Sequence, residues 1–129
     1  MNISPFFRNV TFYDYIYNYM KLNPLLLDQI RQCTLCKDSL PNPPTPVLQF
    51  SSMAKIMVIG QAPGIHAHTS QTPWNDASGK RLREWLLMSD EAFYDVNNVA
   101  IVPMGFCYPG TGKSGDLPPR PECAKTWHT

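Results

Sequence analysis

A long segment containing glycine and proline separates an apolar run from an amphipathic run near the middle of the chain. The apolar run is "AKIMVIG" (residues 54–60), the segment continues as "QAPGIHAHTSQTPWNDAS", and "GKRLREWLLM" follows. Connections between a strand and a helix usually take only a few residues, so a longer one is either functional or disordered. The apolar and aromatic residues here are not typical of disorder. We therefore expect a functional loop.

Short apolar runs alternate with amphipathic ones along the chain. "AKIMVIG" and "NVAIVPM" predict two buried parallel strands. "PLLLDQIRQC", "SGKRLREWLLM", "SDEAFYD" and "PECAKTWHT" predict helices, with Ser78 and Ser89 as N-caps. Residues 6–22, "FFRNVTFYDYIYNYMKL", also predict a helix. This order predicts an α/β fold with a parallel central sheet flanked by helices.

The remaining segments predict loops. Residues 37–52 are rich in proline and residues 105–120 in glycine and proline, so both are expected to run over the surface. In such sheets a ligand binds beyond the carboxyl ends of the strands, where residues 60–76 and 105–120 emerge. In the helix between the strands, Leu82, Trp85 and Leu86 share one face, which we expect to be buried. Its basic residues are expected to face solvent: Lys80, Arg81 and Arg83.

Composition narrows the class of protein. A length of 129 residues suits one domain, residues 1–129, and 43% hydrophobic with 16% charged residues is typical of a soluble globular protein. A net charge of +1 neither indicates nor excludes nucleic acid as a partner. Residues 1–10 do not resemble a signal peptide, and no apolar run approaches the roughly 20 residues that span a bilayer. We expect a cytoplasmic monomer without membrane contact.

The four cysteines form one close pair and two distant members. Cys33 and Cys36 form a C-x2-C pair, whereas fifteen residues separate Cys107 from Cys123. Four unrelated thiols are one interpretation, and a disulfide framework is unusual in a cytoplasmic chain of this size. Zinc sites favour two close pairs, and the spacing fits an iron–sulfur cluster at least as well. The spacing therefore predicts a metal site without choosing the metal.

Two loop motifs and the cysteines together resemble the uracil-DNA glycosylase superfamily. The motifs are "VIGQAPG" and "TPWNDASGKRL", followed by Cys107 and Cys123, and they are most similar to the branch that binds a [4Fe-4S] cluster. The resemblance runs from about Cys33 to the end of the chain. It implies base-excision repair of single- or double-stranded DNA, by hydrolysis of the N-glycosidic bond of a flipped uracil or related deaminated base. It also implies a structural cluster, with zinc as the alternative, held by Cys33, Cys36, Cys107 and Cys123.

The resemblance further implies a base pocket in the long loop. Trp74 stands where the family has a phenylalanine that stacks on the flipped base, and an indole can do the same. The tight turn after the first strand would offer backbone N–H groups to the departing base anion. The residues implied in substrate binding are Gly60, Ala62, Pro63, Gly64 and Trp74.

The sequence departs from the family at three places. Gln61 replaces a glutamate, and an amide can hold a water molecule but cannot act as a general base. Asp76, the nearest carboxylate, could replace it or cap the following helix, and we favour the cap. Pro103 replaces an asparagine that reads the pyrimidine edge, and the family's later histidine loop has no counterpart before Thr129. We therefore expect a domain that lacks the C-terminal part of the fold, and the alternative hypothesis is a catalytically inactive iron–sulfur or zinc module.

Overall fold

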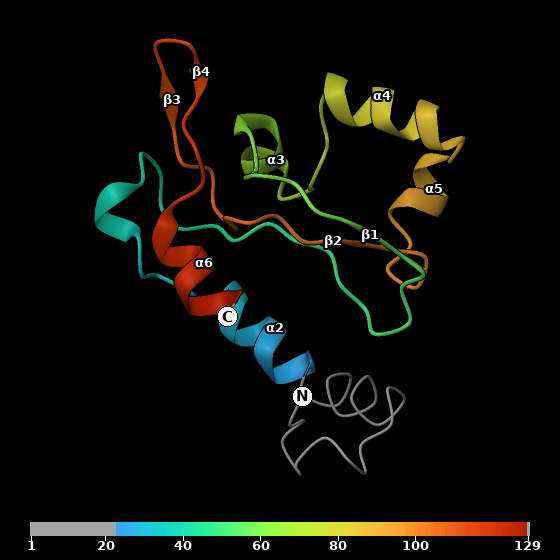
Figure 1. The fold of residues 1–129 in the computed structure, drawn as a ribbon, viewed down its shortest axis with the longest axis horizontal. Helices are drawn as coiled ribbons and strands as arrows, with labels where there is room; N and C mark the ends of the chain where they lie inside the picture. The colour runs from blue at the N-terminus through green and yellow to red at the C-terminus, as the bar shows by residue number, and fades with distance from the viewer. Residues whose placement is uncertain (1–22, 129) are drawn as a thin grey trace, which may run out of the picture.

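Two short parallel strands form the centre of the fold in the computed structural model, which describes residues 23–128 (Figure 1). β1 (Ile56–Val58) pairs with β2 (Val99–Ile101), with Ile56 opposite Val99 and Val58 opposite Ile101. Both strands are apolar and rich in β-branched side chains, which fit a pleated surface. The parallel pairing confirms the predicted α/β fold.

Helices flank the two strands (Figure 1). The predicted helices are confirmed as α2 (Asn23–Arg31), α4 (Ala77–Leu86), α5 (Asp90–Phe93) and α6 (Pro121–Trp127). Both predicted long loops also contain regular structure, namely α3 (Ile65–Ser70), β3 (Thr111–Gly112) and β4 (Gly115–Asp116). A 3-10 helix, Lys37–Ser39, follows α2. The helix predicted for residues 6–22 lies outside the described residues. Within residues 23–128 no helix is long and apolar enough to cross a membrane.

Two hydrophobic clusters pack helices against β2 and against the segment that follows it. In the first, Phe93 of α5 packs with Val99 and Ile101 of β2. In the second, Ile30 of α2 packs with Phe106 and with Cys123 of α6, and in Figure 1 α2 and α6 lie side by side. All three residues of β2 are buried, as predicted.

β1 is not buried, contrary to the prediction. Met57 is 53% exposed, and Ile59, directly after the strand, is 65% exposed. β2 lies along one edge of β1, and within the described part of the chain no strand pairs with the other edge. An apolar run does not reveal how many neighbours a strand has, so the sequence pattern could not distinguish these cases.

The proline-rich segment is not a surface loop throughout its length. Val47 and Gln49 are buried, and Gln49 forms an antiparallel bridge with Ile101 through N–H···O distances of 3.0 and 2.7 Å. The side-chain amide of Gln49 donates to the carbonyl oxygens of Phe93 (3.0 Å) and Val99 (2.8 Å). Residues 47–50 contain no proline, so their backbone N–H groups are free to pair along β2.

The prediction for α4 is correct only in part: Leu82 packs against the cluster around Phe93, but Trp85 and Leu86 are exposed and Arg83 is buried. Trp85 is 75% exposed, whereas Arg83 is only 9% exposed. A buried guanidinium needs hydrogen-bond acceptors, and the interior supplies them on this side of the helix. The helix is capped by Asp76 and not by Ser78. The predicted cap of α5 is confirmed, since Ser89 Oγ accepts a hydrogen bond from the N–H of Ala92 at 3.2 Å.

Candidate functional site

The chain leaves β1 alongside the segment that follows β2. The carbonyl oxygens of Gly60 and Gln61 accept hydrogen bonds from the N–H groups of Met104 (2.9 Å) and Gly105 (2.8 Å). These bonds extend the strand pairing beyond the carboxyl ends of both strands. The turn that begins at Gly60 is therefore fixed at the edge where ligands bind in α/β sheets.

A cavity of about 380 Å³ lies at this edge. Its volume is in the range of small-molecule pockets, roughly 300–1,000 Å³. The structure brings together around it every residue predicted for the base pocket, although their roles remain predictions. The cavity is lined, among others, by Gly60, Gln61, Ala62, Pro63, Gly64, Trp74, Asp76, Pro103 and Asp116.

Trp74 forms one wall of the cavity in an unusual backbone conformation. Its φ of 57° lies in the left-handed region, which is costly for a bulky residue. The Trp74 carbonyl accepts a hydrogen bond from Nη1 of Arg83 at 3.0 Å, and the backbone of Gly79 passes directly against it. The indole lies over Gly60 and also packs on the cluster around Phe93. Trp74 is thus both a core contact and a cavity wall.

Arg83 and Tyr94 hold the backbone of the loop that carries Trp74. Arg83 Nη1 also donates to the Tyr94 hydroxyl (3.1 Å), and that hydroxyl donates to the carbonyl of Pro73 (2.9 Å). Burial raises the pKa of Tyr94, so its hydroxyl stays protonated and remains a donor. The Arg83 guanidinium lies over the rings of Phe93 and Tyr94, 5.3 and 5.4 Å from their centroids, and Nε pairs with Asp90 at 2.8 Å. No sequence pattern indicated this arrangement, because a basic residue on a helix is usually exposed.

Asp76 caps α4, as we favoured from the sequence. Its Oδ1 accepts hydrogen bonds from the N–H of Gly79 (2.8 Å) and from Ser78 Oγ (2.7 Å). The same carboxylate borders the cavity. The structural role of Asp76 is therefore confirmed, whereas its catalytic role stays a prediction.

Asp116 is a second carboxylate at the cavity, and sequence reasoning missed it. It ends β4, and its Oδ2 would lie 3.5 Å from a Cβ atom placed on Gly64. Nothing in the sequence predicted that the loop after β2 folds back as a hairpin toward the turn after β1. Gly115, the residue directly after the turn of this hairpin, has a positive φ of 121°, a conformation that only glycine adopts readily.

The four cysteines line one small cavity between the segment after α2, the chain after β2 and α6. All four are free thiols. Cys123 Sγ accepts a weak hydrogen bond from the N–H of Phe106 at 3.4 Å. In residues 23–128 no three His, Cys, Asp or Glu side chains are placed to hold one metal ion. The predicted ligand set is thus gathered in one place, but not around the position of a single ion.

The surroundings of these thiols disfavour negative charge. Burial raises the pKa of Cys107 to about 11 and also raises the pKa of Cys123. The pKa of Cys36 is raised by burial and by the nearby carboxylate of Glu122, which pairs with Arg120 at 2.7 Å. Metal binding requires thiolates, so a cation has to compensate their charge at such a site.

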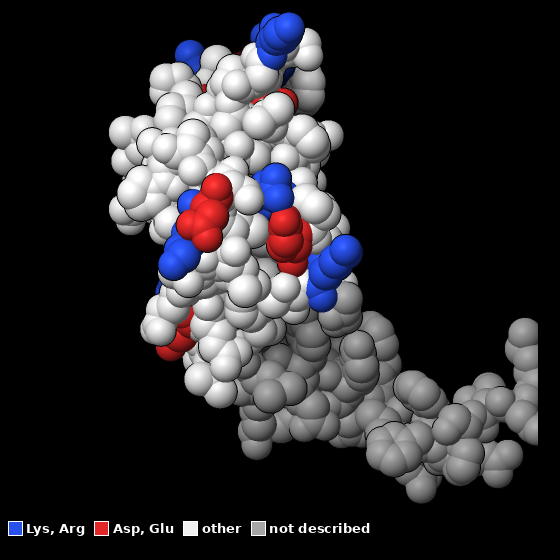
Figure 2. Space-filling view, turned by 90° about the vertical axis from the view of Figure 1, so that its left-hand side faces the viewer, with Lys and Arg blue, Asp and Glu red and all other residues white. Residues whose placement is uncertain are grey.

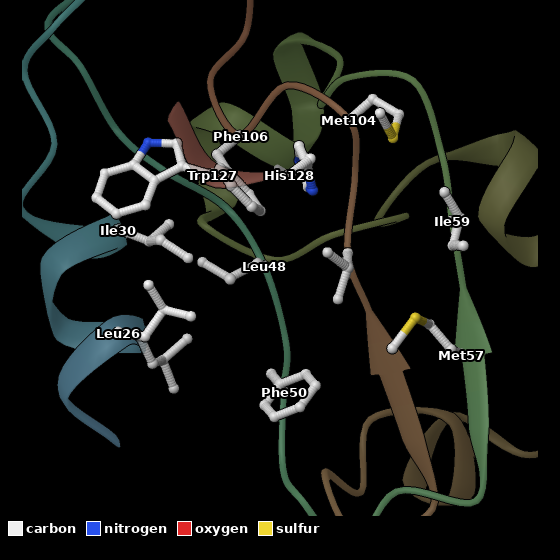
Figure 3. A pocket seen from close by; sticks show the side chains of 12 residues that line it. Leu26, Ile30, Leu48, Phe50, Met57, Ile59, Met104, Phe106, Trp127 and His128 are labelled. Atoms are coloured by element: carbon white, nitrogen blue, oxygen red, sulfur yellow. The ribbon is translucent and has the colours of Figure 1, made fainter. Parts of the chain in front are cut away.

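A second cavity, of about 190 Å³, also borders the chain after β2 (Figure 3). Val102 and Met104 line it, whereas Ile101 and Pro103 line the first cavity, because successive side chains of an extended chain point to opposite sides. Figure 3 shows a largely apolar lining, with His128 as its titratable side chain. This lining offers little for reading a polar base, so the candidate site is the first cavity.

Charges of both signs are interspersed on one face of the molecule. On the face in Figure 2, basic and acidic side chains lie next to one another, and no continuous basic patch covers it. This agrees with the net charge of +1. Recognition of a polyanion through this face would depend on local contacts rather than on a strong field.

The chain was compared with models of known protein families. A family model described as the uracil DNA glycosylase superfamily matches residues 48–129. The match includes β1, β2, the complete turn after β1, the Trp74 loop and two of the four cysteines, Cys107 and Cys123. It does not include Cys33 and Cys36.

Proposed function

The chain belongs to the uracil DNA glycosylase superfamily, and from this premise we propose that it hydrolyses the N-glycosidic bond of a flipped uracil or related deaminated base in DNA. Members of the superfamily act on DNA. The observation that carries the proposal is the cavity beyond the carboxyl ends of β1 and β2, which the turn after β1, Trp74 and Asp76 line together. We expect one domain that acts as a monomer on single- or double-stranded DNA.

The cavity walls suit a flipped base. Trp74 offers an indole face for stacking, and base–aromatic stacking contributes about 1–3 kcal/mol per base. The backbone between Gly60 and Gly64, which begins beside the indole, offers N–H groups at the neighbouring wall, except at Pro63. Donors that face the departing base stabilise the negative charge it acquires when the bond breaks.

Gln61 and Asp76 are proposed to position the attacking water. The Gln61 side chain can donate to a water and accept from it, but it cannot remove its proton. Asp76 uses Oδ1 for the helix cap, which leaves Oδ2 for a water in the cavity. The cap fixes the carboxylate in place, and fixed positioning is what orientation of a nucleophile requires.

We propose that Cys33, Cys36, Cys107 and Cys123 hold a [4Fe-4S] cluster and that the chain is of the cluster-containing branch. Four thiols around one cavity are the donor set that such a cluster takes. A single zinc ion with bonds of about 2.3 Å draws its thiolates closer together, and no three such ligands are so placed within the described residues. The cluster would cross-link α6 to the segment between α2 and β1. Its role would be structural, because hydrolysis of the N-glycosidic bond needs no electrons.

Metal analysis tests this centre. After anaerobic purification we expect about four irons and four acid-labile sulfides per chain, and Cys107→Ser or Cys123→Ser should lose most of both. About one zinc per chain instead would establish the alternative ion. Neither metal, with four titratable thiols, would contradict the proposed centre.

A non-catalytic module of the same fold is the second candidate. Two observations favour it: an amide at position 61, and Pro103 lining the cavity where a polar side chain would read the base. Such a module would keep the metal centre and bind DNA without releasing the base. Base release therefore separates the two candidates.

Uracil release from labelled oligonucleotides tests the pocket. Trp74→Ala should lower the single-turnover rate about 5- to 150-fold, because stacking contributes about 1–3 kcal/mol. Trp74→Phe keeps an aromatic face and should stay within about 3-fold of the wild type. Trp85→Ala is the matched control, since Trp85 is exposed and does not line the cavity. Undiminished release by the Gln61→Ala, Trp74→Ala double variant would show that the pocket lies elsewhere.

A further inference from the structure

We infer that Asp116 is a catalytic residue of this cavity, whose carboxylate takes the proton of the attacking water. The inference rests on the proposed function. It assigns the removal of the water proton to a residue outside the turn after β1, because Gln61 in that turn cannot act as a base.

The hairpin places Asp116 against the base pocket. β3 and β4 pair with Thr111 opposite Asp116 and Gly112 opposite Gly115, and in Figure 1 the hairpin stands beside α3. Oδ2 of Asp116 faces Gly64, which directly precedes α3, at 3.5 Å from the position of a Cβ there. The carboxylate therefore lies at the rim of the cavity, where both water and substrate can reach it.

One oxygen of this carboxylate accepts a hydrogen bond from the hairpin, and the other lies beside Gly64, which lines the cavity. Oδ1 accepts a hydrogen bond from Thr111 Oγ1 at 3.1 Å, and Thr111 Oγ1 is itself hydrogen-bonded to the hydroxyl of Tyr108. Tyr108 is buried, which ties the exposed hairpin to the interior. A carboxylate held through one oxygen keeps its other oxygen in a defined direction, as general-base catalysis needs.

The two carboxylates of the cavity have different surroundings. Asp76 and Asp116 are its only titratable lining residues within the described part of the chain. Asp76 accepts two hydrogen bonds from the first turn of α4, and its negative charge stabilises the N-terminus of that helix. Asp116 begins no helix, and its carboxylate accepts a hydrogen bond from Thr111 across the hairpin. The structure thus favours Asp76 as a positioning residue and Asp116 as the base.

The step is balanced in atoms and electrons. The bond between the sugar carbon and the base nitrogen breaks, and the electron pair leaves with the base. The water oxygen bonds to the sugar carbon, and its proton passes to Oδ2 of Asp116. The base anion takes up a proton from solvent. Asp116 releases the proton that it took from the water to solvent, which regenerates the carboxylate.

The test compares single-turnover rates of uracil release across acid to neutral pH. Asp116→Asn keeps the acceptor for Thr111 but removes the base, and its rate should fall about 10²- to 10⁴-fold. If a carboxylate base is required, the wild-type rate should decline on acidification, and this decline should be absent in Asp116→Asn. Affinity for uracil-containing DNA should change less than about 3-fold. The titratable groups around the hairpin are Lys113, Tyr108, His68 (whose ring centroid lies 6.0 Å from that of Tyr108) and Asp76.

Two further variants make the result decisive. Glu91→Gln removes an exposed carboxylate of α5 outside the cavity and should leave rate and pH profile unchanged. Asp116→Glu restores a carboxylate, and at an equal melting temperature its rate should exceed that of Asp116→Asn, which separates loss of the base from loss of the hairpin.

The outcomes distinguish the inference from the function on which it rests. An active wild type with Asp116→Asn within about 3-fold of it, and with the same acid decline, overturns the role of Asp116 and leaves the glycosylase proposal standing. A wild type that releases no base from uracil-containing DNA overturns both.

Discussion

Gly79→Ala should lower the free energy of unfolding by about 3 kcal/mol or more, or prevent folding. A Cβ atom on Gly79 would overlap the carbonyl oxygen of Trp74 and would lie 2.6 Å from its carbonyl carbon. These are backbone atoms, and Arg83 holds the same carbonyl, so the loop cannot move aside without breaking that bond. In an isolated helix the same change would stabilise by about 1 kcal/mol, which is too little to compensate.

Urea denaturation of Gly79→Ala, followed by tryptophan fluorescence, measures this effect. Gly64→Ala is the matched control, because a Cβ there meets only Asp116 Oδ2 at an ordinary contact distance of 3.5 Å. Its stability should stay within about 1 kcal/mol of the wild type. Equal stabilities of the two variants would mean that α4 does not approach Trp74 as closely as described.

Arg83→Ala should destabilise the protein by about 2–4 kcal/mol and also slow uracil release. The variant loses the hydrogen bonds to the Trp74 carbonyl and the Tyr94 hydroxyl, together with the contacts to two aromatic rings. The Asp90 side chain is 75% exposed, so its charge remains solvated and adds little to the cost. Without Arg83 the Trp74 carbonyl loses the side-chain hydrogen bond that holds this residue in its left-handed conformation.

Two variants of α4 separate the explanations for Arg83. Arg81→Ala removes an exposed neighbour on the same helix and should change stability by less than about 0.5 kcal/mol. Arg83→Lys keeps the charge but not the fork of donors, so its stability should lie between those of Arg83→Ala and the wild type. If Arg83→Lys matches the wild type, charge alone is sufficient and the hydrogen bonds to Trp74 and Tyr94 are not needed.

Local patterns predicted the order of elements and much of the cavity. The strands, α2, α4, α5 and α6 follow from apolar periodicity and capping residues, and a loop between a parallel strand and a helix has to emerge at the ligand-binding edge. For this reason the loop from Gly60 to Asp76 could be placed at the ligand-binding edge from its pattern, whereas the individual pocket residues were implied only by the family resemblance. The cysteines could be grouped only through a family resemblance, because C-x2-C spacing is shared by several metal sites.

Other features depend on contacts that local patterns do not encode. Burial of Arg83 follows from acceptors contributed by Trp74 and Tyr94, nine and eleven residues away. The buried position of Gln49 depends on its pairing with β2, about fifty residues later in the chain. Asp116 reaches the cavity because a hairpin folds back on Gly64. In each case the deciding partner is remote in the sequence, and single-residue propensities carry no information about it.

Residues 101–104 form a partition between two cavities of different character. Ile101 and Pro103 border the cavity with the carboxylates, whereas Val102 and Met104 border the apolar one. A substitution in this stretch alters one compartment and leaves the other intact. Insertion or deletion of one residue reverses the alternation and exchanges the two linings at once. The stretch should therefore tolerate changes of side chain far better than changes of length, because a change of length alters both cavities.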